Sequence, residues 1–142
     1  MECERIIREY LGAIEGDFVC EECDGRLKLI TPYLYPDNDL VEVYVEELLG
    51  GRVRVTDLGE ATRHLHTQGF DIFASPKRKF IAETTATRVS AVFENGAIAK
   101  EGTVQELGSV LFDVITAVRS VADMIHAGRD PGCADFGPAG IK

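Results

Sequence analysis

Long apolar runs are missing from this sequence, which contains no stretch of the roughly 18 consecutive apolar residues that a membrane-spanning helix needs. The first ten residues, MECERIIREY, carry acidic side chains where a secretory signal peptide has a basic head and an apolar middle. We therefore expect a cytoplasmic protein with neither a membrane span nor a secretory leader.

Clustered basic residues are also scarce, because the one cluster is Lys77, Arg78 and Lys79. The net charge is -9, and residues 1–60 carry all of it, with 15 acids against 6 bases, whereas residues 61–142 carry 9 of each. Nucleic-acid backbones are bound through clustered Lys and Arg, so nucleic acid is not an expected partner. An acidic face suits a protein partner with a basic surface or a divalent cation, although such a face also simply keeps a protein soluble.

A complete zinc motif is absent too. Cys20-Glu21-Glu22-Cys23 has the spacing of half a structural zinc site, but the sequence contains no second C-x-x-C and no H-x-x-x-H. Cys3 and Cys133 could complete the set only if both ends of the chain folded back to Cys20 and Cys23. We therefore expect ordinary reduced cysteines and no bound zinc, and Cys20 and Cys23 are the candidates if zinc is held.

Motifs for covalent catalysis and nucleotide binding are likewise missing. No serine stands in a G-x-S-x-G elbow, and Gly50-Gly51 separates two strand patterns instead of preceding a helix as a phosphate-binding loop does.

What the sequence does contain is a succession of clear periodicities. Apolar residues recur at helical spacing near both ends, strand-like alternation fills the region between, and Asp24-Gly25, Gly50-Gly51 and Asn95-Gly96 mark hairpin turns. The predicted elements are a helix over 2–14, strands over 17–20, 26–31, 40–48 and 52–56, helices over 60–68 and 76–85, strands over 88–93 and 97–99, and a helix over 104–126. We expect one α+β domain over residues 1–127, its mostly antiparallel sheet packed against the N- and C-terminal helices, followed by a Gly- and Pro-rich tail over 128–142.

The last helix carries an unbroken heptad seam behind a capping box that starts at Thr103. The seam consists of Leu107, Leu111, Val114, Val118, Val121 and Ile125. Such a seam either covers the sheet or pairs with a second copy, so a homodimer through the 104–126 helix is one of two interpretations.

Polar residues gather at the strand ends between Ile30 and Glu60, and we call this region the acidic corner. If Asp37 and Asp39 close over the end of the strand that finishes at Asp57, these three carboxylates could bind Mg²⁺ and serve catalysis. The alternative is that Asp37 forms a turn and Asp57 caps the following helix, which needs no ligand. The candidate binding residues are Thr31, Tyr33, Asp37, Asp39, Thr56, Asp57 and Glu60.

The region from Leu27 to Gly69 resembles a prokaryotic family of unknown function, numbered 1828, that occurs in bacteria, archaea and mobile elements. The resemblance depends on Ile30-Thr31-Pro32-Tyr33, on the turn from Asp37 to Asp39 before a Val-rich strand, on Val55-Thr56-Asp57-x-Gly59, and on Gly69. It weakens toward Phe93, and the chain departs from the family pattern in its C-x-x-C hairpin, in its long tail, and at Asp57-Leu58-Gly59, where the family often has a second acid. The family implies no activity, but its phage and defence settings imply a small accessory or regulatory protein.

We therefore expect a small acidic, non-enzymatic binding or regulatory module without a cofactor, encoded by a phage, mobile element or defence system. The alternative is a Mg²⁺-dependent nuclease or phosphohydrolase that uses the acidic corner. A restriction-type nuclease would place an acid-x-Lys pair on a strand, and the region between Leu40 and Asp57 lacks one.

Overall fold

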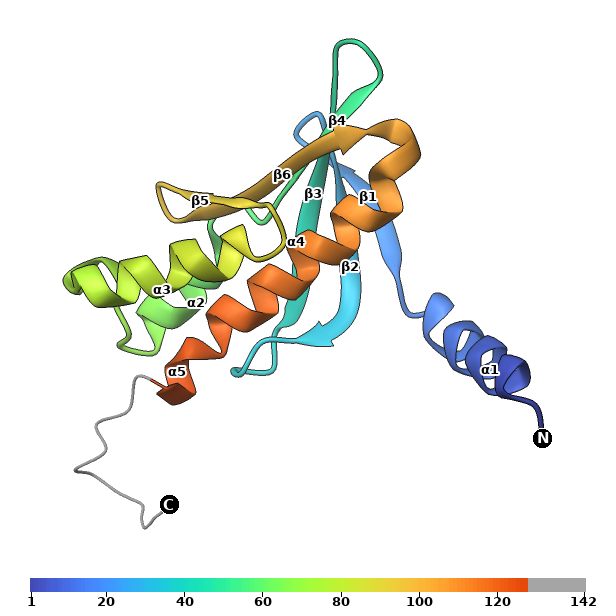
Figure 1. Cartoon of the computed structure of the whole chain (residues 1–142), viewed down its shortest axis with the longest axis horizontal. Helices are drawn as coiled ribbons and strands as arrows, with labels where there is room; N and C mark the ends of the chain where they lie inside the picture. The colour runs from blue at the N-terminus through green and yellow to red at the C-terminus, as the bar shows by residue number, and fades with distance from the viewer. Residues whose placement is uncertain (128–142) are drawn as a thin grey trace.

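The computed structural model describes residues 1–127, and the predicted tail over 128–142 lies outside this range. Figure 1 shows one twisted antiparallel sheet. Along the chain, helices precede the first strand, separate the fourth strand from the fifth, and follow the last strand. The elements are α1 (Cys3–Glu15), β1 (Val19–Cys23), β2 (Arg26–Leu34), β3 (Leu40–Leu48), β4 (Arg52–Thr56), α2 (Glu60–Thr67), η1 (Ile72–Ala74), α3 (Pro76–Thr87), β5 (Val92–Glu94), β6 (Ala97–Thr103), η2 (Val104–Glu106), α4 (Leu107–Ala122) and α5 (Met124–Ala127). Within residues 1–127, every helix is too short or too polar to span a lipid bilayer.

The sheet has six strands in the order β1-β2-β3-β4-β6-β5, with every neighbouring pair antiparallel. The α+β class and the predicted element order are confirmed, as are the hairpin turns at Asp24-Gly25, Gly50-Gly51 and Asn95-Gly96. In each of these turns both residues have positive φ, which Gly, Asn and Asp adopt more readily than other residues.

The α4 helix crosses one face of the sheet and forms the main core with it (Figure 1). Alternation along β3 directs Val41 and Val43 into this core, where both are fully buried. The seam residues of α4 meet them there, with Val114, Val118 and Val121 buried to the same extent. Of the two interpretations of the heptad seam, the structure therefore shows packing on the sheet, and these valines are not exposed to a second copy.

The other face of the sheet carries a ladder of ion pairs across neighbouring strands. Glu46 of β3 pairs with Arg26 at 2.5 Å and with Arg54 at 3.8 Å, and Arg54 also reaches Glu101 at 3.2 Å. Lys28 lies between Glu21 at 3.3 Å and Glu42 at 3.9 Å. Across the β3–β4 hairpin, Glu46 faces Arg54 in the register, whereas Arg52 faces Leu48. On this face, Glu21, Glu42 and Glu46 are therefore each close to a basic side chain.

Four strands have bounds that differ from the predictions. The strand predicted over 17–20 is shifted to Val19–Cys23, and the strand predicted over 97–99 continues to Thr103. Pro32 does not end β2, because the strand continues to Leu34, and the register with β3 shifts between Ile30 and Leu34 so that Pro32 lies in an irregular segment. The strand predicted over 88–93 begins only at Val92, because α3 continues to Thr87 and Ser90 takes a positive φ of 60°. In each case the local pattern gave the right element and at least one wrong end.

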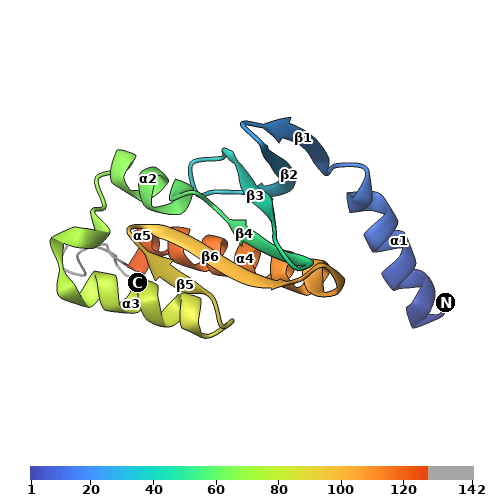
Figure 2. The ribbon, with the colours of Figure 1, turned by 90° about the horizontal axis from the view of Figure 1, so that it is seen from above.

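The N-terminal helix is the largest departure. Figures 1 and 2 show α1 extending away from the sheet, whereas the sequence predicted that it packs against it. None of the residues of α1 is buried, and its apolar stripe, formed by Ile6, Ile7, Tyr10 and Leu11, is more than half exposed. The helix forms at the predicted place, but its apolar side contacts no part of the described chain closely enough to be covered.

Candidate functional site

The loop between β2 and β3 builds one side of the candidate site. Tyr35 N–H donates to the Asp39 carbonyl at 2.8 Å, and Asn38 N–H donates to the Tyr35 carbonyl at 2.8 Å, so the loop closes as a tight turn. Asn38 takes the left-handed backbone conformation with φ of 71°, which Asn tolerates better than most residues. The predicted turn over Pro36, Asp37 and Asn38 is confirmed, and it places two aspartates next to α2.

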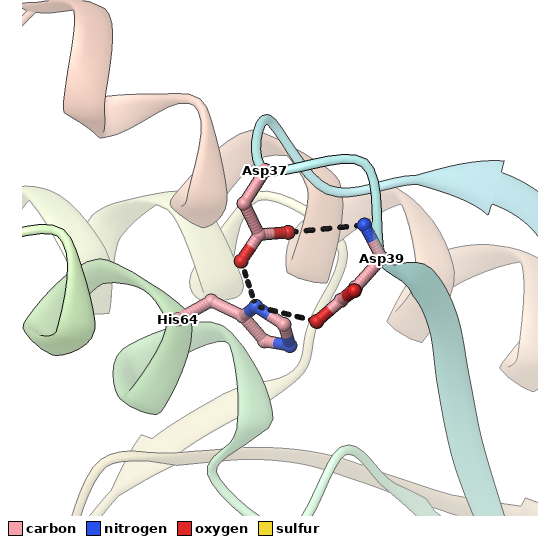
Figure 3. Close-up of side chains that lie close together, drawn as sticks. All are labelled: Asp37, Asp39 and His64. Atoms are coloured by element: carbon pink, nitrogen blue, oxygen red, sulfur yellow. Dashed lines mark hydrogen bonds and ion pairs between the residues drawn. The ribbon is translucent and has the colours of Figure 1, made fainter.

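Three side chains meet where this loop approaches α2 (Figure 3). Asp37 accepts the Asp39 backbone N–H at 3.1 Å with one carboxylate oxygen and the His64 Nδ1–H at 2.5 Å with the other. The Asp39 carboxylate lies 3.9 Å from the same His64 nitrogen. One potential ligand atom from each of Asp37, Asp39 and His64 lies within 4.8 Å of the others.

The electrostatics of Asp37 follow from these contacts. Partial burial raises the pKa of its carboxyl, but the hydrogen bonds from His64 and from the Asp39 backbone outweigh burial and hold the pKa below its ordinary value. Asp37 is therefore ionised at neutral pH. Its link to His64 ties the loop to α2 across 27 residues of sequence.

Beside this cluster is a pocket of about 360 Å³, which we call the acidic pocket. Asp39, Glu42 and Glu60 contribute carboxylates to its wall. The one basic residue in its lining, Arg63, forms a close ion pair with Glu60. The other lining residues are Tyr35, Asn38, Leu40 and His64. The pocket is therefore rich in hydrogen-bond acceptors and carries net negative charge.

Tyr35 forms the floor of the acidic pocket. Its ring stacks on the His64 imidazole with centroids 3.9 Å apart, and the residue is only 2% exposed. Its hydroxyl has no hydrogen-bond partner within residues 1–127, which is uncommon for a buried polar group. Burial, and next to it the negative charges of Asp57 and Glu60, raise the pKa of Tyr35 far above its ordinary value, so the hydroxyl keeps its proton.

Asp57 plays a different part from the one a metal site requires. It is fully buried, and its carboxylate accepts backbone N–H groups from Gly59 at 2.9 Å, Ala61 at 3.0 Å and Ile98 at 2.9 Å. Burial raises the pKa of Asp57, and these three donors oppose that shift without cancelling it. The capping interpretation is the one that the structure shows, and a Mg²⁺ set of Asp37, Asp39 and Asp57 is wrong because the oxygens of Asp57 are already used.

Of the other predicted binding residues, some bond to the backbone or lie elsewhere, and the rest are at the candidate site. Thr31 is buried and donates to the Val41 carbonyl at 2.8 Å, and Thr56 accepts the Leu58 N–H at 3.1 Å, so both hydroxyls serve the backbone. Tyr33 contacts Phe18 and Arg119 and does not line the acidic pocket. Of the seven predicted residues, Asp37, Asp39 and Glu60 are the ones at the candidate site.

The two cysteines of the C-x-x-C motif lie on β1, not in a turn. Residues three apart on a strand point to opposite faces, so Cys20 and Cys23 cannot both approach one ion while β1 stays extended. Neither belongs to a group of three or more potential metal ligands within the described part of the chain. The zinc candidates are therefore not supported, and Cys133 lies outside the described residues.

His64 is the site residue that sequence reasoning missed. His64 and His66 are two residues apart in the sequence and therefore lie on different sides of a helix, which by itself does not indicate a site. A usable signal was present, because His64 follows Glu60 by four residues and adjoins the apolar positions Ala61 and Leu65 that bury one side of α2. A histidine at the edge of a buried stripe is held rigidly enough to support a site.

Comparison with known families confirms the resemblance to the family numbered 1828. The model of the family described as domain of unknown function DUF1828 matches residues 31–121. The chain belongs to this family. The match covers the sheet from β2 onward together with α2, α3 and most of α4, and so extends well past Phe93, whereas α1 and most of the C-x-x-C hairpin precede it. No curated protein and no solved structure matches the chain.

Proposed function

We propose that this protein is a non-enzymatic binding module that holds a basic side chain of a partner protein in its acidic pocket. The observation that carries the proposal is the buried, unpartnered hydroxyl of Tyr35, a residue that lines the pocket together with Glu42 and Glu60. A lysine ammonium or arginine guanidinium supplies several N–H donors, and the carboxylates and the tyrosine oxygen accept them.

The size and composition of the pocket fit this use. Its volume of about 360 Å³ lies at the lower end of the range of roughly 300 to 1,000 Å³ that small-ligand pockets occupy. Its lining offers acceptors and contains no Ser, Cys or Lys side chain that could act as a nucleophile. Because the Tyr35 hydroxyl is buried, a bound basic side chain reaches its oxygen only when the wall of the pocket opens slightly.

Binding of short lysine- and arginine-containing peptides, measured by fluorescence anisotropy, tests the proposal. We expect Glu42→Gln to weaken binding about tenfold, since a hydrogen bond to a charged group contributes about 1.5 to 3 kcal/mol. The matched control is Glu47→Gln, which removes the same charge from an exposed position of β3 outside the pocket. Equal losses in both variants would show general charge attraction and overturn the proposal.

The second candidate is a metal-dependent nuclease or phosphohydrolase, and the convergence of Asp37, Asp39 and His64 favours it. Since imidazole suits Mn²⁺, Fe²⁺ or Zn²⁺ better than Mg²⁺, this site changes the expected metal as well as the ligand set. The metal would have to replace the hydrogen bond between Asp37 and His64.

Thermal unfolding with added Mg²⁺, Mn²⁺ or Zn²⁺ distinguishes the two candidates. A metal site predicts a rise in Tm with Mn²⁺ or Zn²⁺ that Asp39→Asn abolishes, because the Asp39 side chain is 70% exposed and its replacement leaves the fold intact. Binding of basic peptides that is unchanged by these metals, with no metal-dependent rise in Tm, supports the binding module.

The expected partner is thus a protein with a basic surface. The net charge of -9 argues against nucleic acid, because phosphates would be repelled from the pocket. We also keep a homodimer and a regulatory role in a phage, mobile element or defence system as parts of this proposal. The genes that neighbour its coding sequence would test that setting.

A further inference from the structure

We propose that two copies of this chain form a dimer by exchanging their α1 helices, each helix lying in an apolar groove of the other copy. The groove is a pocket of about 240 Å³ between the start of the β1–β2 hairpin and α4. Its apolar lining consists of Phe18, Leu29, Tyr33, Leu111, Phe112 and Ile115. It lies apart from the acidic pocket and shares no lining residue with it.

The α1 helix is only marginally stable by itself. It has 13 residues, contains Gly12, and has no side-chain cap at its N-terminus. An isolated helix shorter than about 12 to 15 residues is marginal in water, and an interior glycine costs about 1 kcal/mol more. A surface that covers its apolar stripe is what would stabilise it.

The groove, like the stripe of α1, is not covered by the rest of the described chain. Phe112 on α4 is 69% exposed, although large aromatic side chains usually lie in cores or interfaces. Phe18 packs edge-to-face on Tyr33 with centroids 6.2 Å apart, and Arg119 stacks on the same tyrosine at 4.5 Å. The aromatic wall is therefore preorganised by contacts within one chain and presents a rigid apolar surface.

The turn after α1 directs this helix away from the body of its own chain. After α1 the chain turns through residues 16–18, where Asp17 N–H donates to the Ile14 carbonyl at 3.0 Å and Phe18 N–H donates to the Glu15 carbonyl at 3.3 Å. These bonds continue the helical direction into the turn, and both views show α1 extending away from its own body (Figures 1 and 2). In this arrangement α1 is placed for the groove of a second copy.

The apolar stripe of α1 offers a large part of the area that a specific dimer interface needs. At about 100 Å² of exposed apolar surface per side chain, the stripe of Ile6, Ile7, Tyr10 and Leu11 presents about 400 Å². Two reciprocal arms therefore remove about 800 Å² of apolar surface from the two α1 helices, and the surface that they cover on the groove, including the exposed Phe112, adds to this area. Reciprocal exchange gives a closed twofold dimer with no surface left over for further growth.

Analytical ultracentrifugation of the full chain at micromolar concentration tests the proposal. The expected mass is twice the chain mass of 15.6 kDa. Leu11→Asp on α1 and Phe112→Asp in the groove should each give the monomer mass. The matched control Gly12→Asp introduces the same charge on the side of α1 away from the stripe, where an added Cβ meets no atom within 4 Å, and should stay dimeric.

Mixing the two monomeric variants separates exchange from other modes of association. One copy with Leu11→Asp and one with Phe112→Asp keep a single intact arm between them, so the mixture should recover dimer in part, whereas neither variant does alone. If α1 paired with α1, Phe112→Asp would remain dimeric. A monomer mass for the unmodified chain, or a dimer that both variants leave unchanged, would overturn the proposal.

Discussion

Asp37 and Asp57 each introduce a tight turn next to α2, yet the structure uses them in opposite ways. Asp57 is fully buried and its carboxylate is consumed by three backbone donors. Asp37 keeps a side chain that is 27% exposed and binds one histidine at the rim of a pocket. The comparison teaches that an aspartate at a strand end indicates a site only when its oxygens are not already satisfied by the backbone.

The largest effect should come from Asp57→Ala. The variant leaves the N–H groups of Gly59, Ala61 and Ile98 buried without an acceptor, at about 1 kcal/mol or more each, so we expect a loss of about 3 kcal/mol or more in the free energy of unfolding. Urea unfolding measures it. Asp39→Ala is the control and should change stability by less than about 0.5 kcal/mol. A small effect of Asp57→Ala would remove the distinction between the two aspartates.

His64→Ala should have an intermediate effect. It removes the hydrogen bond to ionised Asp37 and the stacking on Tyr35, and we expect a loss of about 2 kcal/mol. A double-mutant cycle with Asp37→Asn should show a coupling of about 1 kcal/mol, because the two side chains share one contact. Additive losses would mean that His64 acts only through packing.

Acidification should change the contributions of Asp37 and Asp57 to the stability of the fold in opposite directions. The pKa of Asp37 is lowered in the folded state, so its stabilisation is complete above the unfolded value of about 4 and is lost as pH falls through the lower folded value. The pKa of Asp57 is raised, so its contribution is greatest below the unfolded value and is lost as pH rises through the folded value.

Urea midpoints measured from neutral to acidic pH check these signs. Asp37→Asn should lose less stability on acidification than the unmodified chain, and Asp57→Asn should lose more. Parallel curves for the two variants would contradict the assignment of opposite shifts.

The smallest effect should come from Tyr35→Phe. Removing a buried hydroxyl that has no partner in residues 1–127 should be neutral or stabilise the protein by up to about 1 kcal/mol. The same variant should weaken binding of a basic peptide, since the tyrosine oxygen is one of its proposed acceptors. A clear loss of stability without the peptide would show that the hydroxyl is already satisfied.

The fold followed from the sequence because its signals are local. The alternation of Val41 and Val43, the Asp-Gly and Asn-Gly turns, and the capping box that joins Thr103 to Glu106 specify strands, hairpins and a helix start within a few residues. Element ends were less well predicted, since β2 passes through Pro32 by an irregular pairing that depends on its neighbour β3.

The candidate site could be predicted from the sequence only in part. The sequence pointed to Asp37 and Asp39 from their turn, but their partner His64 lies 27 residues further along, and neither turn chemistry nor periodicity connects such distant residues. The sequence left Asp57 as either a helix cap or a metal ligand. In the structure its carboxylate also accepts the N–H group of Ile98, 41 residues away, and this distant contact could not be read from the local pattern.

The two terminal helices, α1 and α4, show which features the sequence determined and which depended on the tertiary structure. The sequence by itself determined that α1 and α4 are helices with one apolar side, because a period near 3.6 residues is a property of the chain alone. Only the tertiary structure decided that α4 is covered by the sheet while the stripe of α1 stays exposed. The physical reason is that burial depends on which surfaces meet, and that is set by the direction in which the chain leaves each turn.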